Sequence, residues 1–311
     1  MSRIAVMIPR DLPAASFVEF VQRAEQHGCD ELWVVEDLGF HGGIAQAAVA
    51  LAATSTVTVG IGILPAAARN VAFAAMELNT LAGLFPGRVI AGVGHGMADW
   101  IRHVGAWPES PLTLFEETVT ALQRLLAGER VTVNGRYVRL NEVELENPAA
   151  IVPPVLAGVR GPKSMALAGR VSEGVVLAEP VTPEYLDIVK GQLGLSDPTI
   201  VAFALAAVDD DPEVARHRVR PALAPLGDLD WAPHIAPLAF AEDFRELRAS
   251  MTADEFAQAM PDEWVDQLTV VGTPDDARER IVTLHAAGAT CVVLIPVGDP
   301  FEALDQFARI L

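Results

Sequence analysis

Residues 155–169, VLAGVRGPKSMALAG, place glycines and positive charge where an apolar run gives way to a helical one. Gly158 and Gly161 free the backbone, and the proline that follows suits the first turn of a helix. The N–H groups of that turn have no partner within the helix, and the helix dipole favours an anion there. Arg160 and Lys163 add positive charge in a chain that has only two lysines. The stretch therefore predicts a phosphate-binding loop, with an ordinary Gly-Pro helix start as the alternative.

Carboxylates and a histidine follow two other apolar runs. Glu36 and Asp37 come directly after ELWVV, where a carboxylate can orient a substrate or move a proton, and where burial raises its pKa. The alternative is a helix cap or an ion pair. His95, in GVGHG, is the second candidate for acid chemistry or for ligand binding, against a packed histidine. Arg69, after GIGILP, either meets an anion or forms a surface ion pair.

Glycines recur at the ends of these runs. Gly92, Gly94 and Gly96 alternate, which removes side chains from one face of an extended segment and leaves a flat floor against which a planar ring fits. Gly60 and Gly62 make room for a close approach to the backbone. A flat floor and a phosphate loop together indicate a phosphorylated cofactor with a planar ring, without identifying the ring.

The elements that must position these residues are eight short apolar runs separated by stretches of helical period. This alternation predicts a (β/α)8 TIM barrel of the α/β class, and no GxGxxG opens a helix near the start, as an open Rossmann sheet would require. Active sites of such barrels lie at the carboxyl ends of the strands, where all the residues above are found. The expected strands are 3–8, 31–35, 57–64, 88–93, 154–158, 174–178, 200–208 and 291–297.

Two regions depart from the simple repeat within what we expect to be a single domain, residues 1–311. Residues 129–152 resemble a hairpin with Asn134-Gly135 as its turn. Residues 209–268 are rich in Pro, Asp and Ala, and we expect them to form extra helices between the seventh and eighth strands that shape the substrate pocket.

Composition excludes several classes of partner. The formal charge of −19 argues against nucleic acid and against an anionic membrane surface. No apolar run reaches the roughly 18 residues of a membrane helix, and no secretory signal is evident, so a soluble cytoplasmic protein is expected. Cys29 and Cys291 fit no metal spacing and are expected to be buried free thiols, and no metal site is predicted.

Several of these segments together resemble the bacterial-luciferase-like superfamily of flavin- or deazaflavin-dependent oxidoreductases. They are AEQHGCDELWVVEDL, GLFPGRVIAGVGHGMADWIRHVG, PVLAGVRGPKSMALAGRVSEGVVLAEPVTPEYL and VGTPDDARERIVTLHAAGATCVVLIP. The chain is most similar to the branch that uses coenzyme F-420, an 8-hydroxy-5-deazaflavin, as in methylenetetrahydromethanopterin reductase-like proteins. The features that point there are ED after the second strand, GVGHG after the fourth, and GPKSMALAG with SEGVVLAEPVTPEYL.

The resemblance implies a TIM barrel with insertions, often as a homodimer, and two-electron hydride transfer with a small-molecule substrate. It implies that the ring lies over a bulge in the third strand with a non-prolyl cis peptide, which motif position places at Gly62–Ile63. The candidates for substrate protonation or positioning are Glu36, Asp37 and His95. The candidates for cofactor binding are Gly62, Ile63, Arg69, Gly94, His95, Gly96, Ala157, Gly158, Val159, Arg160, Gly161, Lys163 and Glu179.

Some features stand apart from the F-420 pattern. Family members often have Arg-His-Pro where this chain has Arg69-Asn70-Val71, which questions a contact at Asn70. The anionic oligoglutamate tail of coenzyme F-420 is disfavoured by the net charge, unless a rim of Arg69, Arg160 and Lys163 offsets it. The alternatives are an FMN-dependent monooxygenase with a separate flavin reductase, a cofactor-binding barrel without turnover, and a barrel acting on a phosphorylated metabolite. The sequence does not identify the substrate.

Overall fold

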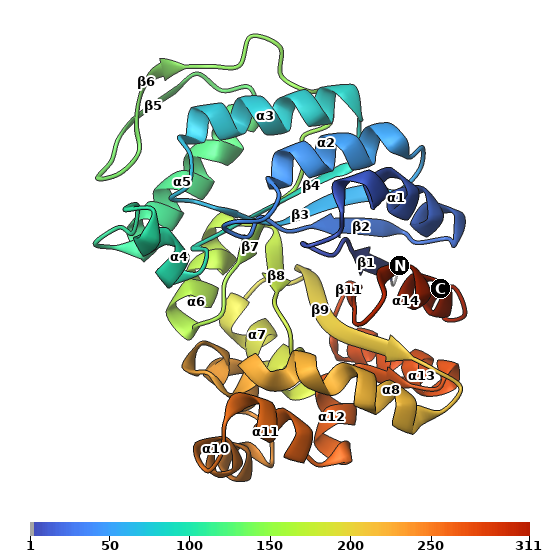
Figure 1. Cartoon of the computed structure of the whole chain (residues 1–311). Coiled ribbons are helices and arrows are strands. Elements are labelled where there is room, and N and C mark those ends of the chain that lie inside the picture. The colour runs from blue at the N-terminus through green and yellow to red at the C-terminus, as the bar shows by residue number, and fades with distance from the viewer. Residues whose placement is uncertain (1–2) are drawn as a thin grey trace.

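The computed structural model describes residues 3–311, and its centre is a closed parallel β-barrel (Figure 1). Each strand pairs with its neighbours in parallel, and pairing of β8 with β9 and of β11 with β1 completes the ring. The (β/α)8 barrel expected from the sequence is confirmed, with strand limits within about one residue of those expected. The barrel strands are β1 (Arg3–Met7), β2 (Glu31–Val34), β3 (Thr58–Pro65), β4 (Val89–Gly94), β7 (Val155–Gly158), β8 (Gly174–Leu177), β9 (Thr199–Val208) and β11 (Cys291–Pro296).

Helices surround the barrel and bury one face each against it. In α1 the residues at helical spacing, Phe17, Val21 and Ala24, are buried as the pattern predicts. None of the helices formed by residues 3–311 is long and apolar enough to cross a membrane. The helices that follow or flank the barrel strands are η1 (Ala14–Ser16), α1 (Phe17–Gln26), α2 (Gly43–Ala53), α3 (Val71–Leu84), α4 (Ala98–His103), α5 (Pro111–Leu126), α6 (Pro162–Val171), α7 (Pro183–Leu193), α13 (Pro274–Ala287) and α14 (Pro300–Phe307).

The hairpin predicted within residues 129–152 is present as β5 (Val131–Asn134) and β6 (Arg139–Val143). Its connection is longer than the expected two-residue turn, because Asn134 pairs with Arg139 and the loop spans 135–138. The Glu117 carboxylate of α5 accepts backbone N–H groups from three residues of the hairpin loop at 2.8–2.9 Å. A tertiary contact therefore fixes this turn, which local sequence alone does not show.

The extra helices predicted between the seventh and eighth strands gather on one side of the barrel, beside β9 (Figure 1). A short strand missed by the sequence analysis, β10 (Val270–Gly272), pairs in parallel with the end of β9. The elements of this region are α8 (Pro212–Val219), η2 (Arg220–Gly227), η3 (Leu229–Trp231), α9 (Ala232–Ile235), α10 (Ala241–Ala249), α11 (Ala253–Ala259) and α12 (Asp262–Leu268).

Aromatic side chains fill the barrel interior. Trp33 is fully buried and meets Phe203 edge to face, with ring centroids 5.7 Å apart. A Cβ atom at Gly60 would lie 2.4 Å from the Trp33 ring, so the glycine makes room for this indole. The close approach expected at Gly60 is therefore one within the core.

Candidate active site

A cavity of about 1400 Å³ opens at the carboxyl ends of the barrel strands. The region 209–268 contributes to its wall through Pro221, Leu226 and Trp231, as expected for a region that shapes the pocket. Most of the sequence-predicted site residues line the cavity: Glu36, Asp37, Gly62, Ile63, His95, Gly96, Gly158, Val159, Arg160, Gly161 and Glu179. Four of them do not: Arg69, Gly94, Ala157 and Lys163.

The bulge in β3 lies at the floor of the cavity. The pairing of β3 with β4 shifts between Ile61 and Leu64, and the Gly62–Ile63 peptide bond is cis, at the position given by the motif. A Cβ at Gly158 would lie 2.5 Å from Ile63 Cγ2, and one at Gly94 would lie 2.5 Å from Ile63 Cδ1. The predicted bare glycine floor is therefore wrong in its physical reason. Gly92, Gly94 and Gly158 accommodate the Ile63 side chain, whereas Gly96 lies beside Pro65, and the bulge itself lines the cavity.

The predicted phosphate loop connects β7 to α6. Gly161 is the N-cap of α6 and no side chain caps this helix, so its first N–H groups are available to an anion. The Arg160 guanidinium stacks over Trp231, 4.7 Å from the ring centroid, and pairs with no carboxylate of residues 3–311. Behind the loop, the Tyr185 hydroxyl donates a hydrogen bond to the Arg160 carbonyl at 3.4 Å. The loop therefore offers backbone donors and one unpaired cation.

The basic rim expected from Arg69, Arg160 and Lys163 is reduced to Arg160. Arg69 donates to Glu36 at 2.9 Å and lies 3.5 Å from Glu77, so its charge is compensated away from the cavity wall. Lys163 is exposed because its position in α6 faces away from the barrel. Ala157 and Gly94 lie within the strands rather than beyond their ends and are buried.

The two carboxylates that follow β2 have different hydrogen-bond partners. Glu36 Oε2 accepts from Arg69 and from the Gly43 N–H that begins α2, at 2.9 and 3.0 Å. This is the ion pair and helix cap that formed the alternative to a chemical role. Asp37 accepts from Arg10 Nη1 at 2.8 Å, and Arg10 also lies over the Phe40 ring, 4.7 Å from its centroid.

His95 is held between α5 and α6. Its Nε2 lies 3.0 Å from the Ser164 hydroxyl, and its ring is tilted against Phe115 with 5.2 Å between centroids. Burial lowers the pKa of His95, so the imidazole is neutral at pH 7. It therefore suits hydrogen bonding at the phosphate end of the cavity better than it suits proton donation. Asn70, where the family pattern is lost, caps α3 by accepting from the Ala72 N–H at 2.9 Å.

Glu179 follows β8 and is half-buried in the cavity wall, as Glu36 and Asp37 are. Within residues 3–311 no other side chain donates a hydrogen bond to its carboxylate or forms an ion pair with it, and the donor beside it is its own backbone N–H. Burial raises the pKa of Glu179 and the nearby Asp37 charge raises it further, while its own backbone N–H, Arg160 and Arg10 lower it. The Glu179–Pro180 peptide bond is cis.

Arg10 and Trp231 are among the side chains of this wall that the sequence analysis missed. Arg10 follows the first strand in IPRD, and the rule that barrel sites lie at strand ends identifies it once that strand is considered. Trp231 lies in a short 3-10 helix of the extra region, where no periodic pattern marks it. Elsewhere, Cys29 and Cys291 are free and buried, as expected. No cluster of metal-binding side chains occurs in the described part of the chain.

Known proteins are similar to this chain in sequence. The sequence model of the luciferase-like monooxygenase family matches residues 1–291. The 5,10-methylenetetrahydromethanopterin reductase of Methanolobus tindarius is 28% identical, covering 94% of this chain and 93% of its own. The F-420-dependent glucose-6-phosphate dehydrogenase of Intrasporangium calvum is 30% identical, covering 96% of this chain and 93% of its own.

A solved structure shows the same architecture. The coenzyme F-420-dependent tetrahydromethanopterin reductase of Methanopyrus kandleri superposes with a TM-score of 0.82 over 100% of this chain and 98% of the other. Sequence identity is 20%, so this likeness establishes the barrel fold.

Proposed function

The chain belongs to the luciferase-like monooxygenase family and is an oxidoreductase, and we propose that it transfers hydride between coenzyme F-420 and a small organic substrate. The observation that carries the choice of coenzyme is the 30% identity, over 96% of the chain, to a dehydrogenase named as F-420-dependent. The cavity fits a phosphorylated coenzyme, since one end carries an uncapped helix N-terminus beside an unpaired arginine.

In this proposal the phosphate end and the ring end of the cavity have separate tasks. Arg160 and the first N–H groups of α6 hold the phosphate, and the Ser164 hydroxyl bonded to His95 completes that end. The Ile63 bulge supports the ring from the floor. Bound coenzyme F-420 supplies a ring carbon that accepts or releases hydride. Asp37, fixed by Arg10, orients the substrate.

A side-by-side fluorescence titration of the purified protein with coenzyme F-420 and with FMN tests the choice of coenzyme. The proposal expects saturable binding of coenzyme F-420 and weaker binding of FMN. Tight binding of FMN alone would contradict it and would favour a monooxygenase supplied by a separate flavin reductase. Binding of neither would also contradict it.

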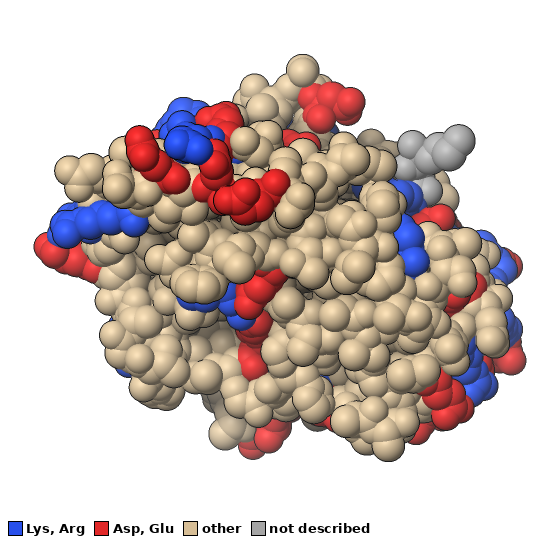
Figure 2. Space-filling model, turned by 90° about the horizontal axis from the view of Figure 1, so that it is seen from above, with Lys and Arg blue, Asp and Glu red and all other residues tan. Residues whose placement is uncertain are grey.

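We also propose that the protein is a homodimer that pairs through α2 and α3. Helix α2 has no charged residue, and α3 has only Glu77. Seen from the side on which these helices lie, the surface has wide areas without charged side chains, interrupted by a cluster of acidic and basic atoms near its middle and by others at its rim (Figure 2). Large apolar side chains of the two helices are exposed: Val49, Phe73, Met76 and Leu84, by 44%, 63%, 52% and 67%.

Sedimentation measurements test this proposal. The wild type is expected to be a dimer and Phe73→Glu a monomer; a monomeric wild type would refute the proposal.

A further inference from the structure

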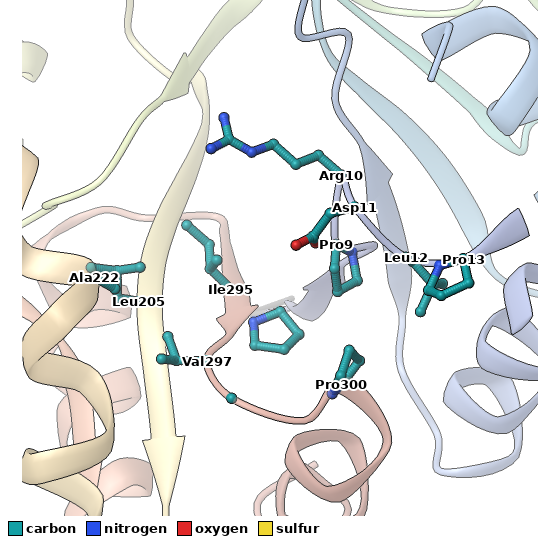
Figure 3. Close-up of a pocket in the computed structure, with 12 residues that line it drawn as sticks. Pro9, Arg10, Asp11, Leu12, Pro13, Leu205, Ala222, Ile295, Val297 and Pro300 are labelled. Carbon is teal, nitrogen blue, oxygen red and sulfur yellow. The ribbon is translucent and has the colours of Figure 1, made fainter. Parts of the chain in front are cut away.

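A second cavity of about 520 Å³ extends from the active site toward β1, β9 and β11. Figure 3 shows Pro9 and Asp11 on one side of it and Leu205, Ala222 and Ile295 across from them. This side lobe, defined by the residues at its wall, is mainly apolar and lies away from the α6 loop. It shares with the main cavity Pro9, Arg10, Asp11, Leu205, Ala222, Ile295 and Pro296. It is therefore the part of the site left for the body of a substrate when the coenzyme phosphate lies at α6.

Neither cavity has a cationic side chain that is free to bind an anionic substrate. Among residues 3–311, the lysine and arginine side chains that line these cavities are those of Arg10 and Arg160. Arg10 is paired with Asp37, and Arg160 belongs to the coenzyme end across the barrel mouth. The carboxylates at the walls are Asp11, Glu36, Asp37, Glu179 and Asp230. A phosphate ester or carboxylate taken into this space would lose its hydration without gaining a partner.

Among the acidic and histidine side chains of the cavity walls that are not exposed, elimination leaves one group free to exchange a proton. Asp11, His41 and Asp230 also line the main cavity but are exposed. Glu36 is bonded to Arg69 and Gly43, Asp37 to Arg10, and His95 to Ser164. Glu179 lines the main cavity, and no residue of the described chain other than Glu179 itself donates a hydrogen bond to its carboxylate.

We propose that the substrate is an unphosphorylated alcohol or its carbonyl counterpart, with an apolar body in the side lobe, and that Glu179 exchanges its hydroxyl proton. This rests on the proposed function, which supplies the two-electron partner. In oxidation the carbon–hydrogen bond breaks and its electron pair leaves as hydride to oxidised coenzyme F-420. The O–H bond breaks at the same carbon's oxygen, its proton passes to the Glu179 carboxylate, and the C=O bond forms. Reduction runs the same exchange backwards.

The charge environment of Glu179 supports this role. Asp37 faces it from the loop after β2, Arg10 from the loop after β1, and Arg160 from the loop after β7. Burial outweighs the residue's own backbone N–H and the two arginines and raises the pKa of Glu179. A carboxyl group with a raised pKa is a stronger base when ionised and keeps its proton to higher pH for reduction.

The substrate class is tested with the coenzyme-loaded protein and three probes: cyclohexanol, cyclohexanecarboxylate and glucose 6-phosphate. Binding is measured by calorimetry and reduction by the absorbance of the oxidised coenzyme. The proposal expects binding and coenzyme reduction with the alcohol, and neither with the two anions. Reduction by glucose 6-phosphate, tighter binding of the carboxylate, or no reduction by the alcohol overturns it. A protein that fails to bind coenzyme F-420 refutes the proposed function instead.

The role of Glu179 is tested with Glu179→Gln, Glu179→Asp and the control Glu116→Gln, an exposed α5 residue remote from both cavities. The Gln variant is expected to lose about 10²–10⁴-fold in rate with an unchanged dissociation constant for the coenzyme. The Asp variant is expected to recover part of the rate, and the control to match the wild type. The rise of alcohol oxidation with pH is expected to disappear in the Gln variant. An unchanged rate in Glu179→Gln overturns the assignment.

A second readout needs neither coenzyme nor substrate. Infrared titration of the protein alone is expected to show a protonated carboxyl band that persists above the ordinary range of glutamic acid. This band should be absent from Glu179→Gln and present in Asp37→Asn. Its absence from the wild type, or its survival in Glu179→Gln, overturns the assignment.

Discussion

Two glutamates at opposite ends of the barrel show how differently the same side chain is used. Glu31, at the amino end of β2, is 1% exposed and bonds to Arg3, to Trp33 Nε1 at 2.9 Å and to Cys291 Sγ at 3.3 Å. Glu179, beyond the carboxyl end of β8, is half-buried, and among residues 3–311 no other side chain donates to it, only its own backbone N–H. The first carboxylate is surrounded by donors, whereas the second faces an open cavity.

This difference separates a structural end of the barrel from a functional end. A buried charge is tolerated where hydrogen bonds replace its lost hydration, and an unpartnered one lowers stability. The amino end, with Glu31 fully bonded, therefore stabilises the barrel. The carboxyl end keeps Glu179 at a cost in stability, which a function for its free oxygens explains.

The largest expected effect of a substitution on stability is at the amino end. Glu31→Gln removes the charge that Arg3 and the Trp33 indole meet, and we expect the free energy of unfolding to fall by about 2–3 kcal/mol. Urea unfolding measures it. The dissociation constant of coenzyme F-420 should stay unchanged, because Glu31 lies across the barrel from the cavity. If Glu31→Gln were as stable as the wild type, the claim that Glu31 stabilises the amino end of the barrel would be wrong.

Packing at the carboxyl end gives the next effect. A Cβ at Gly158 would lie 2.5 Å from Ile63 Cγ2, so Gly158→Ala should cost about 1–3 kcal/mol in unfolding free energy. It should also weaken coenzyme binding by displacing the bulge. Gly191→Ala is the matched control, since its Cβ meets nothing within 4 Å and the site is an exposed helix interior. That variant should gain about 0.5–1 kcal/mol. Equal stabilities of the two variants would contradict the role of the glycine.

The phosphate loop should affect binding more than stability. Arg160→Gln removes the unpaired cation beside α6, and we expect the dissociation constant of coenzyme F-420 to rise about tenfold or more. Fluorescence titration measures this. Lys163→Gln, on the exposed face of the same turn, is the control and should leave the constant unchanged. A larger rise in the dissociation constant for Lys163→Gln than for Arg160→Gln would contradict this assignment and support the basic rim that the sequence predicted.

The sequence predicted the barrel because each of its strands is an apolar run long enough to recognise. Strand β10 was missed because three residues carry too little pattern. Most cavity residues were identified because strand ends converge in a barrel. The partners of these residues were not identified, because they lie far away in the sequence. Arg69 is 33 residues from Glu36, and Arg10 is 27 residues from Asp37. The glycine floor failed for the same reason, since Ile63 on a neighbouring strand fills the space that alternating glycines leave.

The pH dependence of stability gives the smallest effect, and its sign separates the two ends. Below the ordinary glutamic acid pKa of about 4.3, Glu179 is protonated in both the folded and the unfolded chain. As the pH rises, the unfolded chain loses this proton first, because burial raises the folded pKa of Glu179. The contribution of Glu179 to the wild type's stability therefore falls through this window until its raised pKa is passed.

The most direct test is the free energy of unfolding of wild type, Glu31→Gln and Glu179→Gln, measured in urea from pH 4 upward. The account predicts that Glu31→Gln is less stable than the wild type at neutral pH. It predicts that Glu179→Gln is equally or more stable there, with its advantage growing as the pH rises through the window. Equal losses in the two variants would contradict the division between a structural and a functional end.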